Sequence, residues 1–171
     1  MELKDAMETR RSIRHYSDKE VPLEVIQDIL NCGILAPSAH NRQPWSFIIV
    51  EQDKELKKKI AYLLKEGTDV TVNLTSKVIE ECSALILVYG DITDELFDIQ
   101  SIGACIQNMC LRATDLGLGS LWIGYILRIE NQLKEIFKTD KKLVAALALG
   151  YTDKIPGKRP RVELKDISMW Y

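Results

Sequence analysis

Four short apolar runs alternate with helical segments, and this alternation most constrains the fold of the 171-residue chain. The two most apolar runs are Ala84–Tyr89 (ALILVY) and Leu143–Leu149 (LVAALAL), and neither carries a charged residue. A strand that is apolar on both faces must be covered on both faces. We therefore predict one domain, residues 1–171, in which a sheet lies between two helical layers in an α/β/α arrangement.

Periodicity and helix-ending residues predict the other elements. Ser46–Glu51 and Leu118–Ile123 are expected to be strands, and Gly117 is placed to end a long helix in a left-handed conformation. The residues Gly67–Glu81 show no clear pattern, and from Tyr151 the chain is expected to be an extended tail. Apolar spacing predicts helices at Leu3–Arg10, Pro22 to near Ala36, Asp53–Glu66, Leu96–Leu116 and Ile129–Phe137.

Composition and charge exclude several classes of protein. Apolar residues make up 46% of the chain and charged residues 28%, as in ordinary globular proteins. The net charge of −2 argues against nucleic acid as the main partner. No apolar run has the length of a membrane span, and the first residues do not resemble a signal peptide. The four cysteines and two histidines form no usual zinc pattern, so we expect no metal site and a soluble protein of the cytoplasm.

Two short segments are strongly basic. The first is RRSIR at residues 10–14, and the second is KRPR at residues 158–161. A guanidinium group presents a planar fork of donors that suits a phosphate group. Each segment alone is equally compatible with a solvated basic stretch. If the fold brings them together, they predict a binding site for phosphate.

Two prolines, Pro37 and Pro44, bracket a loop of hydrogen-bonding side chains, PSAHNRQP. Amides such as those of Asn41 and Gln43 both donate and accept hydrogen bonds, as a heteroaromatic ring with alternating carbonyl and NH groups requires. The alternative is an ordinary surface loop. The bracketing prolines favour a binding role for the two amides, whereas Trp45 is predicted to anchor the core.

A glycine-rich segment, GLGSLWIG, occupies residues 117–124. Glycines allow the backbone to approach a flat ligand closely and leave NH groups free to donate. The spacing differs from the dinucleotide-binding fingerprint, and no phosphate-binding P-loop is present. Taken alone, the segment is better explained as a strand punctuated by glycines.

In their order along the chain, RRSIRHY, APSAHNRQPWSF, GLGSLWIG and LGYTDKIPGKRPR resemble the nitroreductase family, of which this would be a short member. The resemblance implies non-covalently bound FMN, with NADH or NADPH as electron donor. It also implies a mixed, mostly antiparallel sheet flanked by helices. The same resemblance implies a homodimer that exchanges C-terminal arms and holds two flavin sites in its interface.

The resemblance further implies which residues bind FMN. Phosphate and ribityl contacts are expected from basic and hydroxyl side chains, namely Arg10, Arg11, Ser12, Arg14, Arg159 and Arg161. The loop is expected to reach the flavin ring from the neighbouring subunit, through Pro37, Ser38, Ala39, Asn41 and Gln43. The segment against the ring is Trp122, Ile123 and Gly124, with a backbone NH of Ile123 or Gly124 facing flavin N5. Asn73 is a further candidate contact.

The implied activity moves reducing equivalents from NAD(P)H through flavin N5 to a small nitroaromatic or quinone acceptor by a ping-pong mechanism. No catalytic side chain is expected, and neither His15 nor His40 has an evident partner, although His40 lies near the predicted pocket. Other chemistries on the same cradle are dehalogenation, enone reduction and flavin fragmentation. A flavin-binding protein without turnover and a structural interaction domain are further alternatives. The motifs contact the cofactor and therefore do not identify the acceptor.

Overall fold

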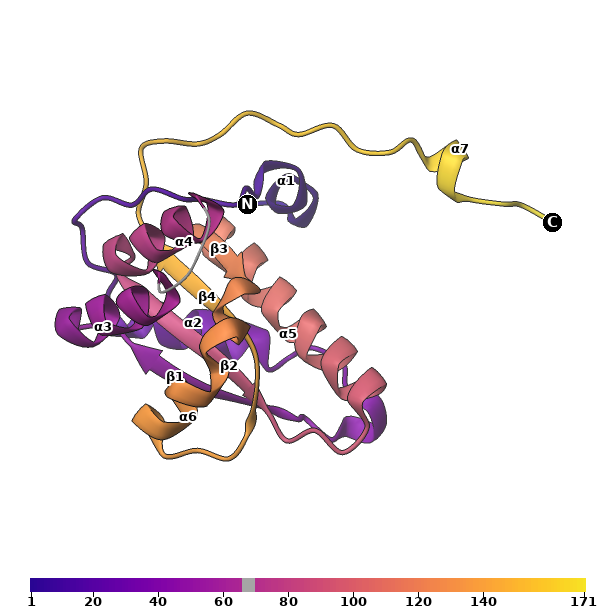
Figure 1. The fold of residues 1–171 in the computed structure, drawn as a ribbon. Helices are drawn as coiled ribbons and strands as arrows, with labels where there is room; N and C mark the ends of the chain where they lie inside the picture. The colour runs from indigo at the N-terminus through magenta and orange to yellow at the C-terminus, as the bar shows by residue number, and fades with distance from the viewer. Residues whose placement is uncertain (66–69) are drawn as a thin grey trace.

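The computed structural model describes residues 1–65 and 70–171, which form a sheet between helical layers (Figure 1). The sheet contains four antiparallel strands in the order β1-β2-β4-β3. Their bounds are β1 Trp45–Val50, β2 Ala84–Gly90, β3 Gly119–Ile123 and β4 Lys142–Gly150. The central strands β2 and β4 come from the two most apolar runs, and every residue of β2 is buried. The predicted helix-covered sheet is confirmed, and a parallel bridge between Ser12 and Ser120 adds to its β3 edge.

Two helices cover one face of the sheet. They are α2 (Leu23–Gly33) and α5 (Glu95–Asp115), which pack against each other and against the side chains of Ile86, Val88 and Leu147. Gly33 permits this close packing, because a Cβ atom there would lie 2.6 Å from Cγ of Met109. After α5, Gly117 has a φ of 74°, as predicted for the residue that ends this helix.

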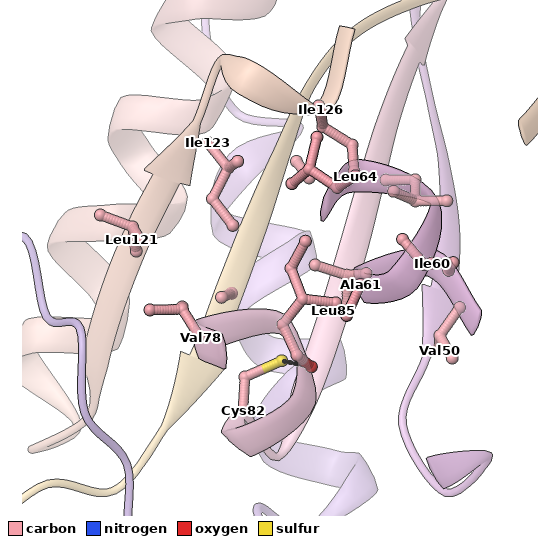
Figure 2. Close-up of a cluster of buried hydrophobic side chains, with 14 of the residues drawn as sticks. Val50, Ile60, Ala61, Leu64, Val78, Cys82, Leu85, Leu121, Ile123 and Ile126 are labelled. Atoms are coloured by element: carbon pink, nitrogen blue, oxygen red, sulfur yellow. Dashed lines mark hydrogen bonds between the residues drawn. The ribbon is translucent and has the colours of Figure 1, made fainter. Parts of the chain in front are cut away.

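Three helices, α3 (Lys54–Lys65), α4 (Val70–Glu81) and α6 (Glu130–Phe137), cover the other face. Figure 2 shows the core on this side, where Leu85 of β2 and Leu121 and Ile123 of β3 lie among Ile60 and Leu64 of α3. Side chains alternate along a strand. Since Leu121 and Ile123 point into this core, Trp122 between them points out of it.

Helix α4 was not predicted. Residues 67–81 are rich in Val, Thr and Ile, which lose side-chain freedom in a helix and so weaken its sequence signal. Packing stabilises the helix instead, since Val78 and Ile79 are fully buried against the core. Nζ of Lys57 in α3 also donates to the carbonyl of Cys82 (2.7 Å), immediately after α4. The first residues of that interval, 67–69, lie outside the described part of the chain.

Smaller elements complete the chain: α1 (Leu3–Thr9), the 3₁₀ turns η1 (Ala39–Asn41) and η2 (Tyr125–Ile129), and α7 (Leu164–Ile167). From Tyr151 the chain leaves the sheet and extends beyond the body of the subunit (Figure 1). The short α7 interrupts the tail that was predicted to be extended. Met169 and Trp170 at its end are more than 80% exposed, so these large apolar side chains have no cover in the described chain. None of the described helices has the length and apolar character needed to cross a lipid bilayer.

Candidate functional site

The arginine segment after α1 is tied to the edge of the sheet. The NH group of Ile13 donates to the carbonyl of Ser120 (2.9 Å), and the Ile13 side chain is buried. Gly119 makes room for it, since a Cβ atom there would lie 2.8 Å from Ile13. This glycine therefore serves packing within the chain rather than approach of a ligand. The buried Ile13 turns its neighbours Ser12 and Arg14 away from the core.

A hollow of about 420 Å³ lies between this segment and the start of the tail. Of the described residues, one with a carboxylate, Glu8, lines it, together with six cationic side chains, namely Arg10, Arg11, Arg14, Lys158, Arg159 and Arg161. None of the six forms a salt bridge with a described residue. The fold thus brings together the two basic segments that are far apart in the sequence. We refer to this space as the basic hollow.

Arg11, which lines the basic hollow, has a hydrogen-bond donor to spare. Its Nη1 donates to the carbonyls of Glu8 (2.7 Å) and Arg10 (2.9 Å), which hold the guanidinium group in place. Its Nε is buried and has no hydrogen-bond partner among the residues that the structure describes. A buried donor without a partner costs about 1–3 kcal/mol. A phosphate oxygen in the hollow would remove that cost.

A second hollow, of about 520 Å³, lies beyond Arg14, which lines both spaces. The end of β3 and the turn η2 form its wall through residues 121–125 and Arg128, and α4 contributes Leu74 and Thr75. The alternation along β3 places the Trp122 side chain on the opposite face of the strand, where it is 44% exposed and where its Cη2 would lie 3.7 Å from a Cβ atom at Gly103 of α5. At Gly124 a Cβ atom would have no neighbour within 4 Å, so the backbone is open to a flat ligand. We refer to this space as the ring hollow.

The loop of residues 37–44 lines neither hollow. Three of its non-glycine residues have left-handed backbone conformations, with φ values of 53° at His40, 54° at Asn41 and 49° at Gln43. Sparsely populated conformations of this kind cost about 1–3 kcal/mol each and persist only where neighbouring structure holds them. The side chains of all three residues are exposed.

An ion pair holds this loop against the first turn of α5. Nη2 of Arg42 donates to Oδ1 of Asp98 at 2.7 Å. The other carboxylate oxygen of Asp98 accepts the backbone NH groups of Thr93 (2.9 Å) and Asp94 (2.8 Å). Asp98 is fully buried, and the hydrogen bonds, first that from Asp94, lower its pKa.

Two serines complete the attachment of the loop. Oγ of Ser101 in α5 accepts the backbone NH of Ala39 (3.3 Å), and Oγ of Ser38 accepts that of Gln43 (3.0 Å). The strained loop is therefore fixed in shape before any ligand binds. Its exposed side chains line neither hollow of the same chain.

The model of the nitroreductase family matches residues 7–151 of the chain. The chain belongs to the nitroreductase family. It is 36% identical over 151 residues to the "Putative NADH dehydrogenase/NAD(P)H nitroreductase" of Archaeoglobus fulgidus, covering 84% of this chain and 81% of that one. The iodotyrosine deiodinase of Hydra vulgaris is 28% identical over 185 residues, covering 87% and 64%. A "putative nitroreductase in complex with fmn" from Desulfovibrio desulfuricans superposes with a TM-score of 0.86 at 29% identity, covering 100% and 97%.

Within this nitroreductase fold, Asn73 and His15 differ from expectation. Asn73 is exposed on α4, beside the hollow-lining Leu74 and Thr75, but does not itself line the ring hollow. His15 was expected to have no partner, and this was wrong: its Nδ1 lies 3.3 Å from Glu81 and its Nε2 lies 3.2 Å from Nζ of Lys154.

The sequence analysis also missed Tyr125 and Arg128, which both line the ring hollow. They follow the glycine-rich segment directly, so that segment was the available signal for them. For Thr75, on a helix that was itself not predicted, the sequence offered no comparable signal.

Proposed function

We propose that the protein is an FMN-dependent oxidoreductase that takes reducing equivalents from NADH or NADPH and passes them to a small nitroaromatic or quinone-like acceptor. The observation that carries this proposal is the pair of adjoining hollows, which share Arg14. The first is cationic, and the second offers the half-exposed ring of Tyr125 and the open backbone at Gly124. FMN joins a phosphate group to a flat ring, and the Desulfovibrio relative was crystallised with FMN.

The phosphate end is bound by the basic hollow in this proposal. Arg10 and Arg11 from one side, with Arg159 and Arg161 from the tail, face the phosphate, and the hydroxyl group of Ser12 donates to the ribityl chain. Hydrogen bonds to charged groups contribute about 1.5–3 kcal/mol each. The net charge of −2 for the whole chain does not oppose this, because the cations are gathered at one place.

Trp122, Ile123 and Gly124 form the wall against the ring, with a backbone NH of Ile123 or Gly124 directed at N5. When bound, FMN supplies hydride acceptance and release at N5, which no side chain of the protein can supply. The protein positions the ring, screens it from water and sets its electrostatic environment. We therefore propose no catalytic side chain and a ping-pong order, in which donor and acceptor use the same hollow in turn.

Arg14 is placed to tune the flavin, because it lines both hollows and is exposed. A cation near the ring stabilises the negative charge that reduction adds. We expect Arg14→Gln to lower the midpoint potential of the bound flavin, measured by spectroelectrochemical titration. A midpoint potential equal to that of the unmodified protein would contradict this role of Arg14.

We propose that the functional unit is a homodimer. A second copy would bring Pro37, Ser38, Ala39, Asn41 and Gln43 to the ring, which explains a loop that is rigidly held yet remote from both hollows of its own chain. The same partner would cover the apolar tail. We also propose Asn73 as a flavin contact at the rim of the ring hollow. The four thiols are free, in keeping with the reducing cytoplasm that we propose as the compartment.

Dehalogenation is the second candidate activity, because relatives of this chain are named iodotyrosine deiodinases. The described residues that line the ring hollow do not separate it from nitro or quinone reduction. Turnover with each acceptor class, including halogenated phenols and enones, would separate these activities. A flavin-binding protein without turnover would reduce none of them.

The first experiment is a visible spectrum of the purified protein before and after NADH or NADPH under anaerobic conditions. We expect a yellow protein that releases one FMN per chain, identified by mass, and that bleaches with either donor. A colourless protein that does not take up added FMN would contradict the proposal. A yellow protein that no donor bleaches would leave FMN binding intact and contradict the oxidoreductase.

A further inference from the structure

We propose that Arg128 makes the ring hollow selective for acceptors that carry an anionic group, with aromatic carboxylates as the substrate class. This inference rests on the proposed flavin function and adds the chemistry of the acceptor to it. Three observations carry it: where Arg128 lies, what holds its guanidinium group, and which charges line the hollow.

Arg128 lies in the turn η2, next to the wall formed by β3. Its guanidinium carbon lies 5.0 Å from the centre of the Tyr125 ring, within the range of a cation–π interaction. Both residues line the ring hollow. The aromatic ring therefore holds the cation at the edge of the hollow rather than leaving it free in solvent.

The charges around the ring hollow are unbalanced. Arg14 and Arg128 line it, and no carboxylate of a described residue does. Arg14 also lines the basic hollow, where it faces the phosphate end of the cofactor, but Arg128 does not. Arg128 forms no salt bridge with a described residue, so its charge is not neutralised within the described chain.

The remaining lining favours a flat partner for this cation. Tyr125 is 40% exposed and offers aromatic surface to the hollow. An aromatic ring that stacks in the hollow can place a carboxylate at Arg128, where a guanidinium group binds it with two parallel hydrogen bonds. A neutral ring of the same shape gains the stacking but not these bonds.

Two molecules could supply the anion: the carboxylate of an acceptor or the pyrophosphate of the nicotinamide donor. Both would use the same arginine. Ping-pong kinetics separate them, because the Michaelis constants for donor and acceptor are measured independently. We assign Arg128 to the acceptor, because the aromatic surface beside it suits a small ring.

The test compares 4-nitrobenzoate with 4-nitrobenzamide, which differ in charge but little in shape. Binding to the oxidised FMN-loaded protein is measured by calorimetry without donor, and kcat/KM is measured with donor. We expect the carboxylate to bind about tenfold more tightly than the amide, the size of one charge-assisted hydrogen bond. Arg128→Gln should abolish the preference for the carboxylate without changing the affinity for the amide. Arg128→Lys should retain part of the preference.

Lys58→Gln is the matched control, because it also removes one positive charge. Lys58 pairs with Glu55 on α3 (2.7 Å) and lines neither hollow, so the tenfold preference should persist. Equal binding of the two ligands to the unmodified protein, or a preference that survives Arg128→Gln, overturns the inference. An effect of Arg128→Gln confined to the KM of the donor overturns the assignment to the acceptor. Failure to bind FMN or to be reduced would instead contradict the proposed function.

Discussion

The arginine segment of residues 10–14 and the loop of residues 37–44 are both expected to contact one cofactor, yet the fold treats them differently. In the arginine segment the backbone is tied to β3, and the charged side chains have no carboxylate partner in the described part of the chain. In the loop the reverse holds: Arg42 and Ser38 are used to hold a strained backbone. The arginine segment offers its side chains to a hollow of its own chain. The loop is held rigidly and offers its side chains to a partner outside its own chain.

This difference indicates that one chain contains only part of the site. The arginine segment should act on the phosphate and be independent of a partner. The loop should act on the ring and depend on the partner that brings it there. Comparing FMN with riboflavin, which lacks the phosphate, measures the two contributions separately.

Deleting residues 162–171 should have the largest effect. The deletion keeps Arg159 and Arg161 but removes Val162, Met169 and Trp170, each at least 66% exposed in the single chain. Burial of a large apolar side chain contributes about 1.5–3 kcal/mol. We expect the shortened chain to be monomeric at micromolar concentration in light scattering, and riboflavin binding to be lost with the dimer. A shortened chain that stays dimeric and binds riboflavin would show that neither the dimer nor riboflavin binding depends on an exchanged tail.

Arg11→Gln should have the next largest effect on flavin binding, and it should lower the affinity for FMN but not for riboflavin. The substitution removes the buried Nε donor and the charge from the basic hollow. We expect FMN to bind about 30-fold more weakly, which corresponds to about 2 kcal/mol, within the range for a hydrogen bond to a charged group. Riboflavin affinity, measured by fluorescence quenching, should change less than twofold. A parallel loss for both flavins would place Arg11 against the ring or in a purely structural role.

Asn41→Ala should lower the affinities for FMN and riboflavin by about tenfold, because one amide contact to the ring contributes at most about 1.5 kcal/mol. Asn41→Gly is the matched variant: it removes the same amide but accepts the φ of 54° without strain. Equal losses in the two variants indicate a contact by the side chain. Full affinity in Asn41→Gly would mean that residue 41 acts only through the shape of the loop.

The sequence predicted the regions that rest on local patterns. Continuous apolar runs placed β2 and β4, and clustered arginines placed the basic hollow. It did not predict α4, whose β-branched residues oppose a helix until Val78 and Ile79 are buried. It also did not predict the ion pair of Arg42 and Asp98, which are 56 residues apart and meet only because the loop folds onto α5. Pairings of this kind depend on tertiary structure and leave no periodic signal.

Asp98→Asn tests that ion pair and should have the smallest effect on binding. Hydrogen bonds from Asp94 and Thr93 and the Arg42 guanidinium lower the pKa of Asp98 in the folded chain. Its contribution to stability is therefore complete above the pKa of the unfolded chain, about 3.9, and is lost as pH falls through the lower folded value. We expect Asp98→Asn to lower Tm at pH 7, with a difference from the unmodified protein that narrows below pH 4.

Asp28→Asn is the control, since Asp28 of α2 pairs with Arg112 near the other end of α5 (2.7 Å), and the substitution so removes an ion pair from the same helix at a site away from the loop. Asp98→Asn should lower the affinities for FMN and riboflavin alike, by about threefold, because the ion pair of Arg42 and Asp98 affects the ring only through the position of the loop. Asp28→Asn should leave both affinities unchanged. If the two variants weaken flavin binding equally, the loss reflects general destabilisation of α5, and the loop does not depend on Asp98 for its position.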